Sequence, residues 1–144
     1  MIEFFAENVA MPQLDFKKIE KWIEEVSARH NYLVGNLTYC FCDDPYILDT
    51  NRKFLNHDYY TDIITFDYTR IFDGEEDFKG RISGDMVISL DTVRTNAESL
   101  GDGYTKELLR VIIHGVLHLC GINDKGPGER EIMEAEENKA LLLL

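Results

Sequence analysis

The sequence is poor in cysteine and has no long apolar run. These two features argue against a disulfide-rich protein and against a membrane protein. Its 144 residues include 3 cysteines, an odd number, so we expect the reduced thiols of a cytoplasmic protein and no disulfide framework. No apolar stretch approaches the ~20 residues that cross a bilayer. The first residues, Met-Ile-Glu-Phe-Phe-Ala-Glu, lack the basic start and the long apolar segment of a signal peptide. We therefore expect neither a membrane span nor a secretion signal.

Basic residues are also scarce. The chain has 15 lysines and arginines against 27 aspartates and glutamates, which gives a formal net charge of −12. Such a charge favours solubility and argues against indiscriminate binding to nucleic acid. The acidic excess is uneven, because residues 79–110 carry five basic and five acidic groups. A nucleic-acid function would therefore need a local basic surface.

What the chain does contain is enough for a packed core. Apolar residues make up 44% of it, with 8 phenylalanines and 7 tyrosines, which excludes a disordered chain. The length is that of one domain, and no segment resembles a linker between two cores. We therefore expect residues 1–144 to form a single domain.

Apolar periodicity divides the chain into short strands and amphipathic helices. Strands are predicted at 2–6, 36–42, 61–66 and 84–89. Helices are predicted at 14–29, 45–55, 91–100, 104–120 and from 127 to about 138. An acidic stretch at 70–81 is expected to form an exposed, mobile loop. Together these elements predict an α+β fold, in which a small mixed sheet of about four strands is covered by about five helices.

Residues with capping preferences mark several of the helix ends. Asp15 and Thr105 are predicted N-caps. Gly101 and Gly121 are predicted to end the helices before them, and Pro127 is predicted in the first turn of the last helix.

The helix at 104–120 is apolar nearly all round, so we expect it in the middle of the domain, and two histidines interrupt it. His114 and His118 are four residues apart, which puts their side chains on one face, close enough to share one ion. Helical zinc sites use this spacing, and a metal would satisfy two imidazoles whose burial otherwise costs free energy. The alternative is a pair of core or capping histidines.

A carboxylate completes a candidate ligand set. Gly121 allows a sharp turn out of the helix, and Asp124 then returns within reach of the same ion. Two imidazoles and one carboxylate leave a fourth position open, as in catalytic zinc sites, so we expect one zinc per chain. Asp124 could instead be a helix cap or a surface turn residue. Cys120 could be a softer ligand, but its direction favours a buried core thiol, and Cys40 and Cys42 are also expected in the core.

Gly115 follows the first histidine, where zinc peptidases of the His-Glu-x-x-His kind carry their general base. No carboxylate of this helix is therefore delivered to a metal-bound water in the manner of those enzymes. We also expect Gly115 to leave room for a bulky group over the metal.

The segment His-Gly-Val-Leu-His-Leu-Cys-Gly at 114–121 resembles the signature of the YbeY family of bacterial rRNA maturation endoribonucleases. Two further blocks resemble family motifs, Thr-Asp-Ile-Ile-Thr-Phe at 61–66 and Gly-Asp-Met-Val-Ile-Ser at 84–89. The order and spacing agree over essentially the whole chain. The resemblance implies a cytoplasmic, zinc-dependent, single-strand-specific endoribonuclease that acts in 16S rRNA 3′-end maturation and ribosome quality control.

The sequence departs from the family pattern at two positions. Asp124 stands where the family's third ligand is a histidine, and a carboxylate oxygen is an acceptable zinc ligand. Leu55 stands where the family carries an arginine, while Arg52 and Lys53 lie about one helical turn earlier. We assign no catalytic arginine, and the residue that acts as general base stays unassigned.

Five basic side chains and one histidine are candidates for contacts with the RNA. Arg52 and Lys53 precede the first block, and Lys125 follows the predicted third ligand. His57 could be a general acid or a phosphate contact, or an ordinary surface histidine. Lys79 and Arg81 precede the second block. Asp62 and Asp85, one in each block, could orient a ligand imidazole or form strand-end hydrogen bonds.

The expected partners are rRNA or another single-stranded RNA and a ribosomal subunit or its proteins, with no DNA and no membrane. Two other functions stay open. A zinc metallopeptidase-like hydrolase would cleave casein rather than RNA. A non-enzymatic, metal-stabilised ribosome-assembly factor would keep its function when His114 is replaced by alanine.

Overall fold

The structure, a computed structural model, describes residues 1–57, 61–69 and 80–144. No helix in these ranges is both long and apolar enough to cross a lipid bilayer. Along the chain the elements are β1 (Ile2–Ala6), α1 (Phe16–Arg29), β2 (Leu33–Cys42), α2 (Asp44–Thr50), a π-helical turn η1 (Asn51–Leu55), β3 (Ile63–Asp67), β4 (Arg81–Ser89), α3 (Leu90–Leu100), α4 (Tyr104–Leu119) and α5 (Glu129–Leu141).

The four strands form one mixed sheet in the order β1-β2-β4-β3. β1 pairs with β2 and β2 with β4 in parallel, while β3 joins the edge antiparallel to β4. The predicted α+β class, with a small mixed sheet and covering helices, is therefore confirmed. β2 and β4 are longer than predicted, because their pairing continues past an irregularity between Val34 and Leu37.

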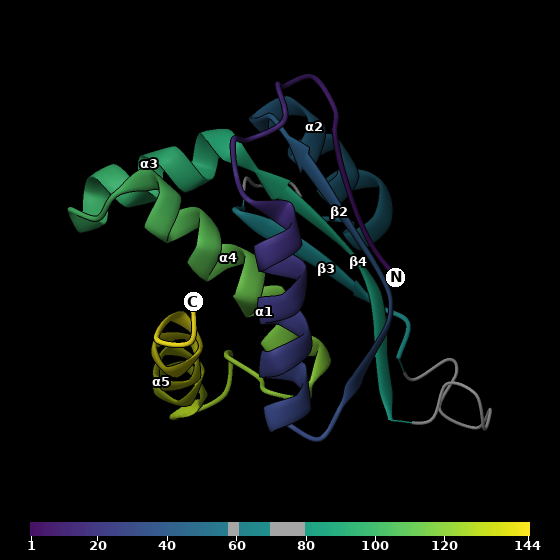
Figure 1. Ribbon diagram of the computed structural model, residues 1–144. Helices are drawn as coiled ribbons and strands as arrows, with labels where there is room; N and C mark the ends of the chain where they lie inside the picture. The colour runs from purple at the N-terminus through teal and green to yellow at the C-terminus, as the bar shows by residue number, and fades with distance from the viewer. Residues whose placement is uncertain (58–60, 70–79) are drawn as a thin grey trace.

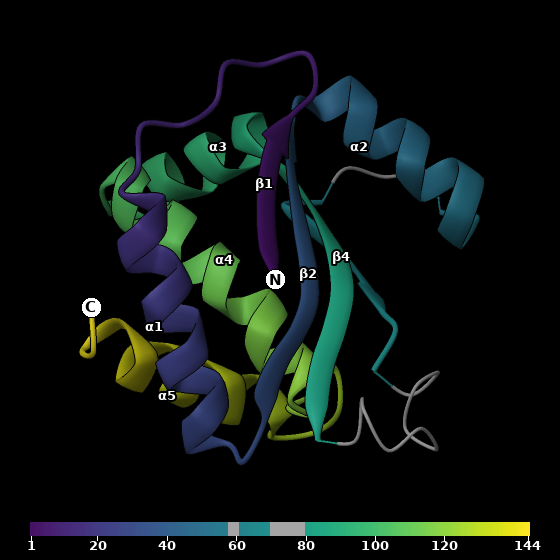
Figure 2. The ribbon, with the colours of Figure 1, turned by 45° about the vertical axis from the view of Figure 1, so that its right-hand side comes forward.

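The helices cover the two faces of the sheet unequally. Figure 2 shows α1, α3, α4 and α5 on one side of the strands and α2 on the other, and Figure 1 gives the view onto the helical layer. The residues of β2 alternate between these layers, as a strand requires. Tyr39 and Phe41 belong to the large core under the four helices, while Cys40 and Cys42 pack in a smaller cluster with Ile47 of α2.

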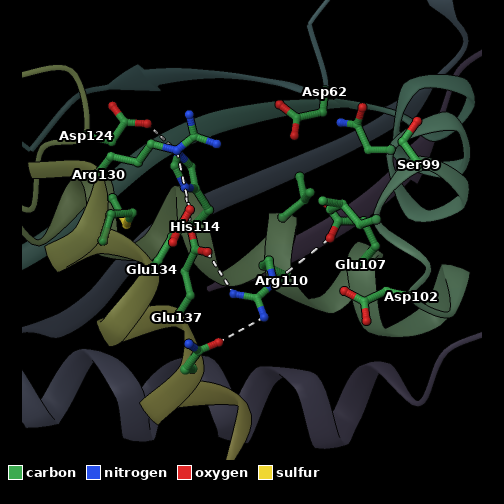
Figure 3. Close-up of a pocket in the computed structure, with 15 residues that line it drawn as sticks. Asp62, Ser99, Asp102, Glu107, Arg110, His114, Asp124, Arg130, Glu134 and Glu137 are labelled. Carbon is green, nitrogen blue, oxygen red and sulfur yellow. Dashed lines mark hydrogen bonds and ion pairs between the residues drawn. The ribbon is translucent and has the colours of Figure 1, made fainter.

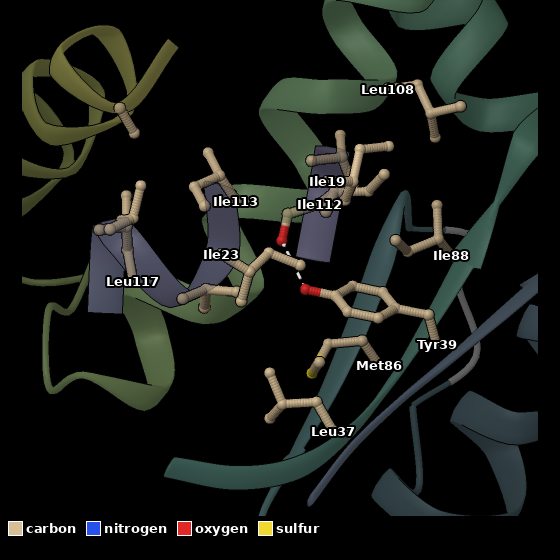
Figure 4. Close-up of a cluster of buried hydrophobic side chains, with 14 of the residues drawn as sticks. Ile19, Ile23, Leu37, Tyr39, Met86, Ile88, Leu108, Ile112, Ile113 and Leu117 are labelled. Atoms are coloured by element: carbon tan, nitrogen blue, oxygen red, sulfur yellow. Dashed lines mark hydrogen bonds between the residues drawn. The ribbon is translucent and has the colours of Figure 1, made fainter. Parts of the chain in front are cut away.

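The middle of α4 is anchored to the sheet by a buried hydroxyl (Figure 4). Tyr39 is fully buried, and its hydroxyl donates a hydrogen bond of 3.0 Å to the carbonyl oxygen of Ile112. Burial raises the pKa of Tyr39 well above its usual value, so the hydroxyl keeps its proton and acts as a donor. The predicted central position of this helix follows from such contacts.

The helix ends agree with the predictions in part. Asp15 caps α1 by accepting a hydrogen bond from the backbone N–H of Lys18. Gly121, with φ of 96°, turns the chain out of α4 as expected. The prediction for Thr105 was wrong, because α4 begins directly after Gly103 and Thr105 lies in its first turn. The prediction for Pro127 was also wrong, because Gly128 is the N-cap of α5 and Pro127 precedes it.

The stretch predicted as a mobile loop lies largely outside the described residues. Only its last two positions, Gly80 and Arg81, are described. Gly80 adopts a positive φ of 75°, and Arg81 is the first residue of β4. The predicted helix at 45–55 is divided into the α-helix α2 and the π-helical turn η1.

Gly115 is a contact between α4 and the sheet, which corrects the expectation that it leaves room over a metal. A Cβ atom on Gly115 would lie 2.9 Å from Cγ of Met86 and 3.1 Å from Cδ1 of Ile63. Both distances are shorter than ordinary van der Waals contact. Glycine is therefore required here because it lets α4 approach β3 and β4 closely.

Replacing Gly115 by alanine is expected to destabilise the protein. In an exposed helix this change gains about 1 kcal/mol of helix propensity. Here the added methyl overlaps β3 and β4, and such overpacking costs about 1–3 kcal/mol, so we expect a net loss of up to about 2 kcal/mol. Urea unfolding of the two proteins measures it. A gain in stability would show that α4 can move away from the sheet at no cost.

Candidate active site

Two adjoining hollows flank α4, and His114 belongs to both. The larger has a volume of about 700 Å³ and lies between α3, α4 and α5 (Figure 3). The smaller has about 240 Å³ and lies beside β3 and η1. The residues common to both are Asp62, His114 and Asp124.

The 3.6-residue period of α4 places a polar stripe beside its apolar faces. Glu107, Arg110, His114 and His118 follow one another at intervals of three or four residues, so their side chains share one side of the helix. His114 lines both hollows and His118 lines the smaller one. The side chain of His114 is 24% exposed, so it is accessible from the hollows while the helix around it is buried.

His114 is oriented by a carboxylate from the last helix. Nδ1 of His114 lies 2.7 Å from Oε2 of Glu137, whose side chain is only 7% exposed (Figure 3). Because an ionised carboxylate can only accept, Nδ1 carries the proton and donates it. In the neutral ring Nε2 then carries the lone pair, and this nitrogen lies 3.4 Å from Oδ2 of Asp124.

Arg110 holds Glu137 in this position. One guanidinium nitrogen, Nη1, donates to Oε1 of Glu137 at 3.1 Å, and the other, Nη2, donates to the side-chain oxygen of Asn138 at 2.9 Å. Nε of Arg110 lies 4.0 Å from Oε1 of Glu107. That oxygen is buried and has no hydrogen-bond partner among the described residues. Arg110 therefore links α4 to α5 directly behind His114.

The surroundings shift the pKa values of three of these groups. Burial alone would lower the pKa of His114, but its hydrogen bond to Glu137 and the charges of Glu137, Asp124 and Asp62 outweigh burial and raise it. Burial raises the pKa of Asp62, and His114 only partly offsets this. Burial and the charge of Asp62 raise the pKa of Glu107 despite Arg110. Asp62 and Glu107 therefore hold protons more readily than exposed carboxyls do.

The three predicted ligands lie in one wall without forming a closed cluster. His114, His118 and Asp124 all line the smaller hollow. Asp124 faces His114, and the helix that follows is capped by Gly128, so the alternative of Asp124 as a helix cap was wrong. Within the described residues, no group of three or more His, Cys, Asp or Glu side chains is drawn together as a metal site.

The candidate RNA contacts divide into two groups. His57 and Lys125 line the smaller hollow together with the histidines of α4. Arg52 and Lys53 are exposed on η1, outside its lining, and Lys53 lies 3.0 Å from Asp49. Arg81 is exposed at the start of β4, and Lys79 lies outside the described residues.

Three further predictions can be compared with the structure. Asp62 lies beside His114, whereas Asp85 accepts a hydrogen bond from the hydroxyl of Tyr68 at 3.0 Å, so an orienting role for Asp85 was wrong. Cys120 is partly buried against the large core, and burial raises the pKa of its thiol to about 12, as for a core thiol rather than a reactive one.

Sequence reasoning missed Arg110, Glu107 and Glu137. Arg110 could have been found, because it stands four residues before His114 on the same stripe of α4. Glu137 carries no such signal, because it is 23 residues from His114 along the chain and its helix is strongly charged.

A family model for the endoribonuclease YbeY matches residues 3–144. The chain belongs to the YbeY family. The endoribonuclease YbeY of Phocaeicola vulgatus is 59% identical over 144 residues, which are 100% of this chain and 99% of that protein. That of Parabacteroides distasonis is 54% identical over 143 residues, 99% of this chain and 95% of the relative.

A solved structure is also similar to this YbeY-family chain. The solution structure of TM1509 from Thermotoga maritima matches with a TM-score of 0.63 and 26% sequence identity. The match covers 97% of this chain and 86% of the other, so the whole architecture is shared.

Replacing Glu137 by glutamine is expected to lower the stability of the metal-free protein, measured by urea unfolding with a chelator present. Losing the charged partner of Arg110 and His114 costs about 1–3 kcal/mol. Glu137 also raises the pKa of His114, and a raised histidine pKa stabilises the fold below the unfolded value of about 6.5 and ceases to do so as the pH rises through the folded value. The loss should therefore be larger at acidic than at alkaline pH.

Glu134→Gln is the matched control on the same helix. Its carboxylate is 57% exposed and lies 3.4 Å from Arg130, so the change should cost less than about 1 kcal/mol at either pH. Equal, pH-independent losses in the two variants would contradict the orienting role of Glu137.

Proposed function

We propose that the chain is an endoribonuclease that cleaves single-stranded RNA with the help of one zinc ion held by His114, His118 and Asp124. One observation carries the proposal. The imidazole of His114, oriented by Glu137 through Nδ1, directs Nε2 toward Asp124 in a hollow that His118 also lines. Membership of the YbeY endoribonuclease family supplies the reaction class.

His114, His118 and Asp124 are residue types that bind zinc. For His114 and Asp124, the distance between the two ligand atoms also suits a zinc ion. Ligand atoms about 2.0–2.1 Å from a tetrahedral zinc lie about 3.3 Å apart. Nε2 of His114 and Oδ2 of Asp124 are separated by 3.4 Å. His118 would supply the third ligand from the next turn of the same helix, and Glu137 is the kind of carboxylate that steers a ligating imidazole in known zinc sites.

When bound, zinc would polarise a phosphoryl oxygen or lower the pKa of water. The chain's own residues would do the rest. Glu137 keeps the Nδ1 proton of His114 in place. Asp62, whose pKa burial raises, stands beside His114 as a group able to give or take a proton. His57 and Lys125 line the same hollow and are suited to contact phosphate oxygens.

The expected cellular role follows from the family resemblance and from the charge. We propose maturation of the 16S rRNA 3′ end and ribosome quality control in the cytoplasm, with no role for DNA or membranes. A protein with a net charge of −12 gains little from general attraction to RNA. Delivery of the RNA by a ribosomal subunit or ribosomal protein would supply the affinity that the chain lacks.

The zinc proposal predicts about one zinc ion per chain in the purified protein. Asp124→Ala should weaken zinc binding at least about tenfold, the loss found when even an outer partner of a zinc ligand is removed. Asp124→His should restore it. Elemental analysis and competition with a chromophoric chelator measure both quantities.

Asp102→Ala is the matched control, because Asp102 lines only the larger hollow and pairs with Lys106 at 3.8 Å. It should bind zinc as the wild type does. A normal zinc affinity in Asp124→Ala would remove Asp124 from the site.

The reaction proposal predicts cleavage of single-stranded RNA, and no cleavage of duplex RNA or casein. His118→Ala should slow RNA cleavage about a hundredfold or more, because several kcal/mol of charge stabilisation would be lost with the ion. A chelator should stop the wild type, and zinc should restore it. Binding should depend weakly on salt, with a slope of roughly −0.7 per phosphate contact.

His30→Ala is the control for this substitution, because His30 lies at the end of α1 and pairs with Glu136 at 3.5 Å. Casein cleavage would favour the peptidase alternative. RNA cleavage that withstands both the chelator and His118→Ala would place the chemistry elsewhere in the molecule.

A further inference from the structure

Phe54 is an exposed aromatic residue beside the smaller hollow. It is 69% exposed, in the π-helical turn η1, and its neighbour Leu55 is 40% exposed. Phenylalanine is usually buried, and a single exposed ring costs free energy that a binding partner can recover. π-helical turns are frequent at functional sites. The exposed ring therefore offers an apolar surface on which a ligand can lie.

The ring of Phe54 is held in place by one neighbour. It meets the ring of Phe66 edge to face, with centroids 5.7 Å apart and an interplanar angle of 81°. Phe66 belongs to β3, pairs with Asp85 of β4 and packs on the smaller core cluster. The fold therefore orients the Phe54 ring while most of its surface stays open to solvent.

The Phe54–Phe66 pair does not line the hollow that contains the histidines, but the chain neighbours of both residues do. Asn51, Leu55 and His57 line this hollow on the η1 side, so Phe54 lies between lining residues along the chain. On the other side, residues 63–65 of β3 line it and Phe66 comes next along the strand. The side chains of Ile63 and Thr65 face α4, whereas Phe66 faces the smaller core cluster on the other side of the sheet. Because β3 is the edge strand, a ligand lying on Phe54 would reach His114 and His118 by passing over this edge.

Charge at this point suits an anionic ligand. Arg52 and Lys53 belong to the same π-helical turn as Phe54, in a chain with an overall charge of −12. Lys53 pairs with Asp49 at 3.0 Å, with 65% and 60% of the two side chains exposed. Such surface pairs contribute little free energy, so the pair can open for a phosphate group.

We propose that Phe54, supported by Phe66, is a stacking platform for one base of the single-stranded RNA substrate, next to the phosphate that enters the hollow. Aromatic rings on which bases stack, flanked by cationic side chains, are the general means of binding single strands. Phe54 and Leu55 alone are too small for a stable protein interface, which buries about 1,200–2,000 Å². The inference rests on the proposed function for the identity of the ligand.

The test uses the full-length protein and a 2′-O-methylated single-stranded oligoribonucleotide that carries 2-aminopurine, whose fluorescence reports stacking. Phe54→Leu removes the ring and keeps an apolar side chain, and Phe54→Trp keeps a ring. Phe5→Leu is the matched control, because Phe5 is 42% exposed on β1, at the opposite edge of the sheet. Cleavage of unmodified RNA is measured in parallel.

Stacking is worth about fivefold to a hundredfold in affinity per base. Phe54→Leu should therefore weaken binding at least about fivefold with less quenching of the probe. The slope of binding with salt should not change, because no phosphate contact is lost. Phe54→Trp should bind at least as tightly as the wild type, and Phe5→Leu should bind like it.

Three results would overturn the proposal. The first is that the wild type does not bind the probe, and the second is that Phe54→Leu binds it as tightly as the wild type does. The third is that Phe54→Leu and Phe54→Trp lose equal affinity. If the second result came with a loss of ribosomal-subunit binding, Phe54 would be assigned to a protein partner. A wild type that binds the probe through Phe54 but cleaves no RNA would contradict the catalytic proposal and leave the platform standing.

Discussion

The ion pair between Arg110 and Glu137 is the interaction on which the geometry of the site depends. Glu137 is 7% exposed, and a carboxylate so buried is tolerated only when its charge is compensated. Arg110 pairs with Oε1 of Glu137, and Oε2 is thereby directed at Nδ1 of His114. The proton on that nitrogen sets the direction of the opposite lone pair. The chemistry available to His114 is therefore decided by a residue of another helix.

The position of α5 must be equally well defined for this arrangement to hold. The indole N–H of Trp22 donates to the carbonyl oxygen of Ala140 at 2.8 Å, and Met133 and Ala140 of α5 are buried in the large core. On the other side, Gly115 lets α4 lie directly against the sheet. The two helices thus reach the site from a common core, so Glu137 and His114 meet with little freedom to move apart.

The sequence predicts most of the fold because the fold rests on local patterns. Alternating apolar residues identify the strands, and the three- and four-residue spacing on α4 identifies both histidines. Features that depend on distant contacts were not predictable. The residues of η1 have no periodicity that separates a π-helical turn from the α-helix before it. The contact of Gly115 with Met86 requires knowledge of which strand lies beneath the helix, so the glycine was interpreted as open space.

The distribution of charge around α4 indicates the side from which an anionic strand can approach. The larger hollow is lined by many carboxylates, and its arginines are engaged with them: Arg110 with Glu137, and Arg130 with Glu134. A phosphate would be repelled there. The smaller hollow has fewer carboxylates and adds Lys125 and two further histidines to its wall. RNA should therefore reach His114 across β3, the edge strand. The larger, acidic hollow would stay free of RNA, and its residue Glu137 would hold the imidazole of His114 in place.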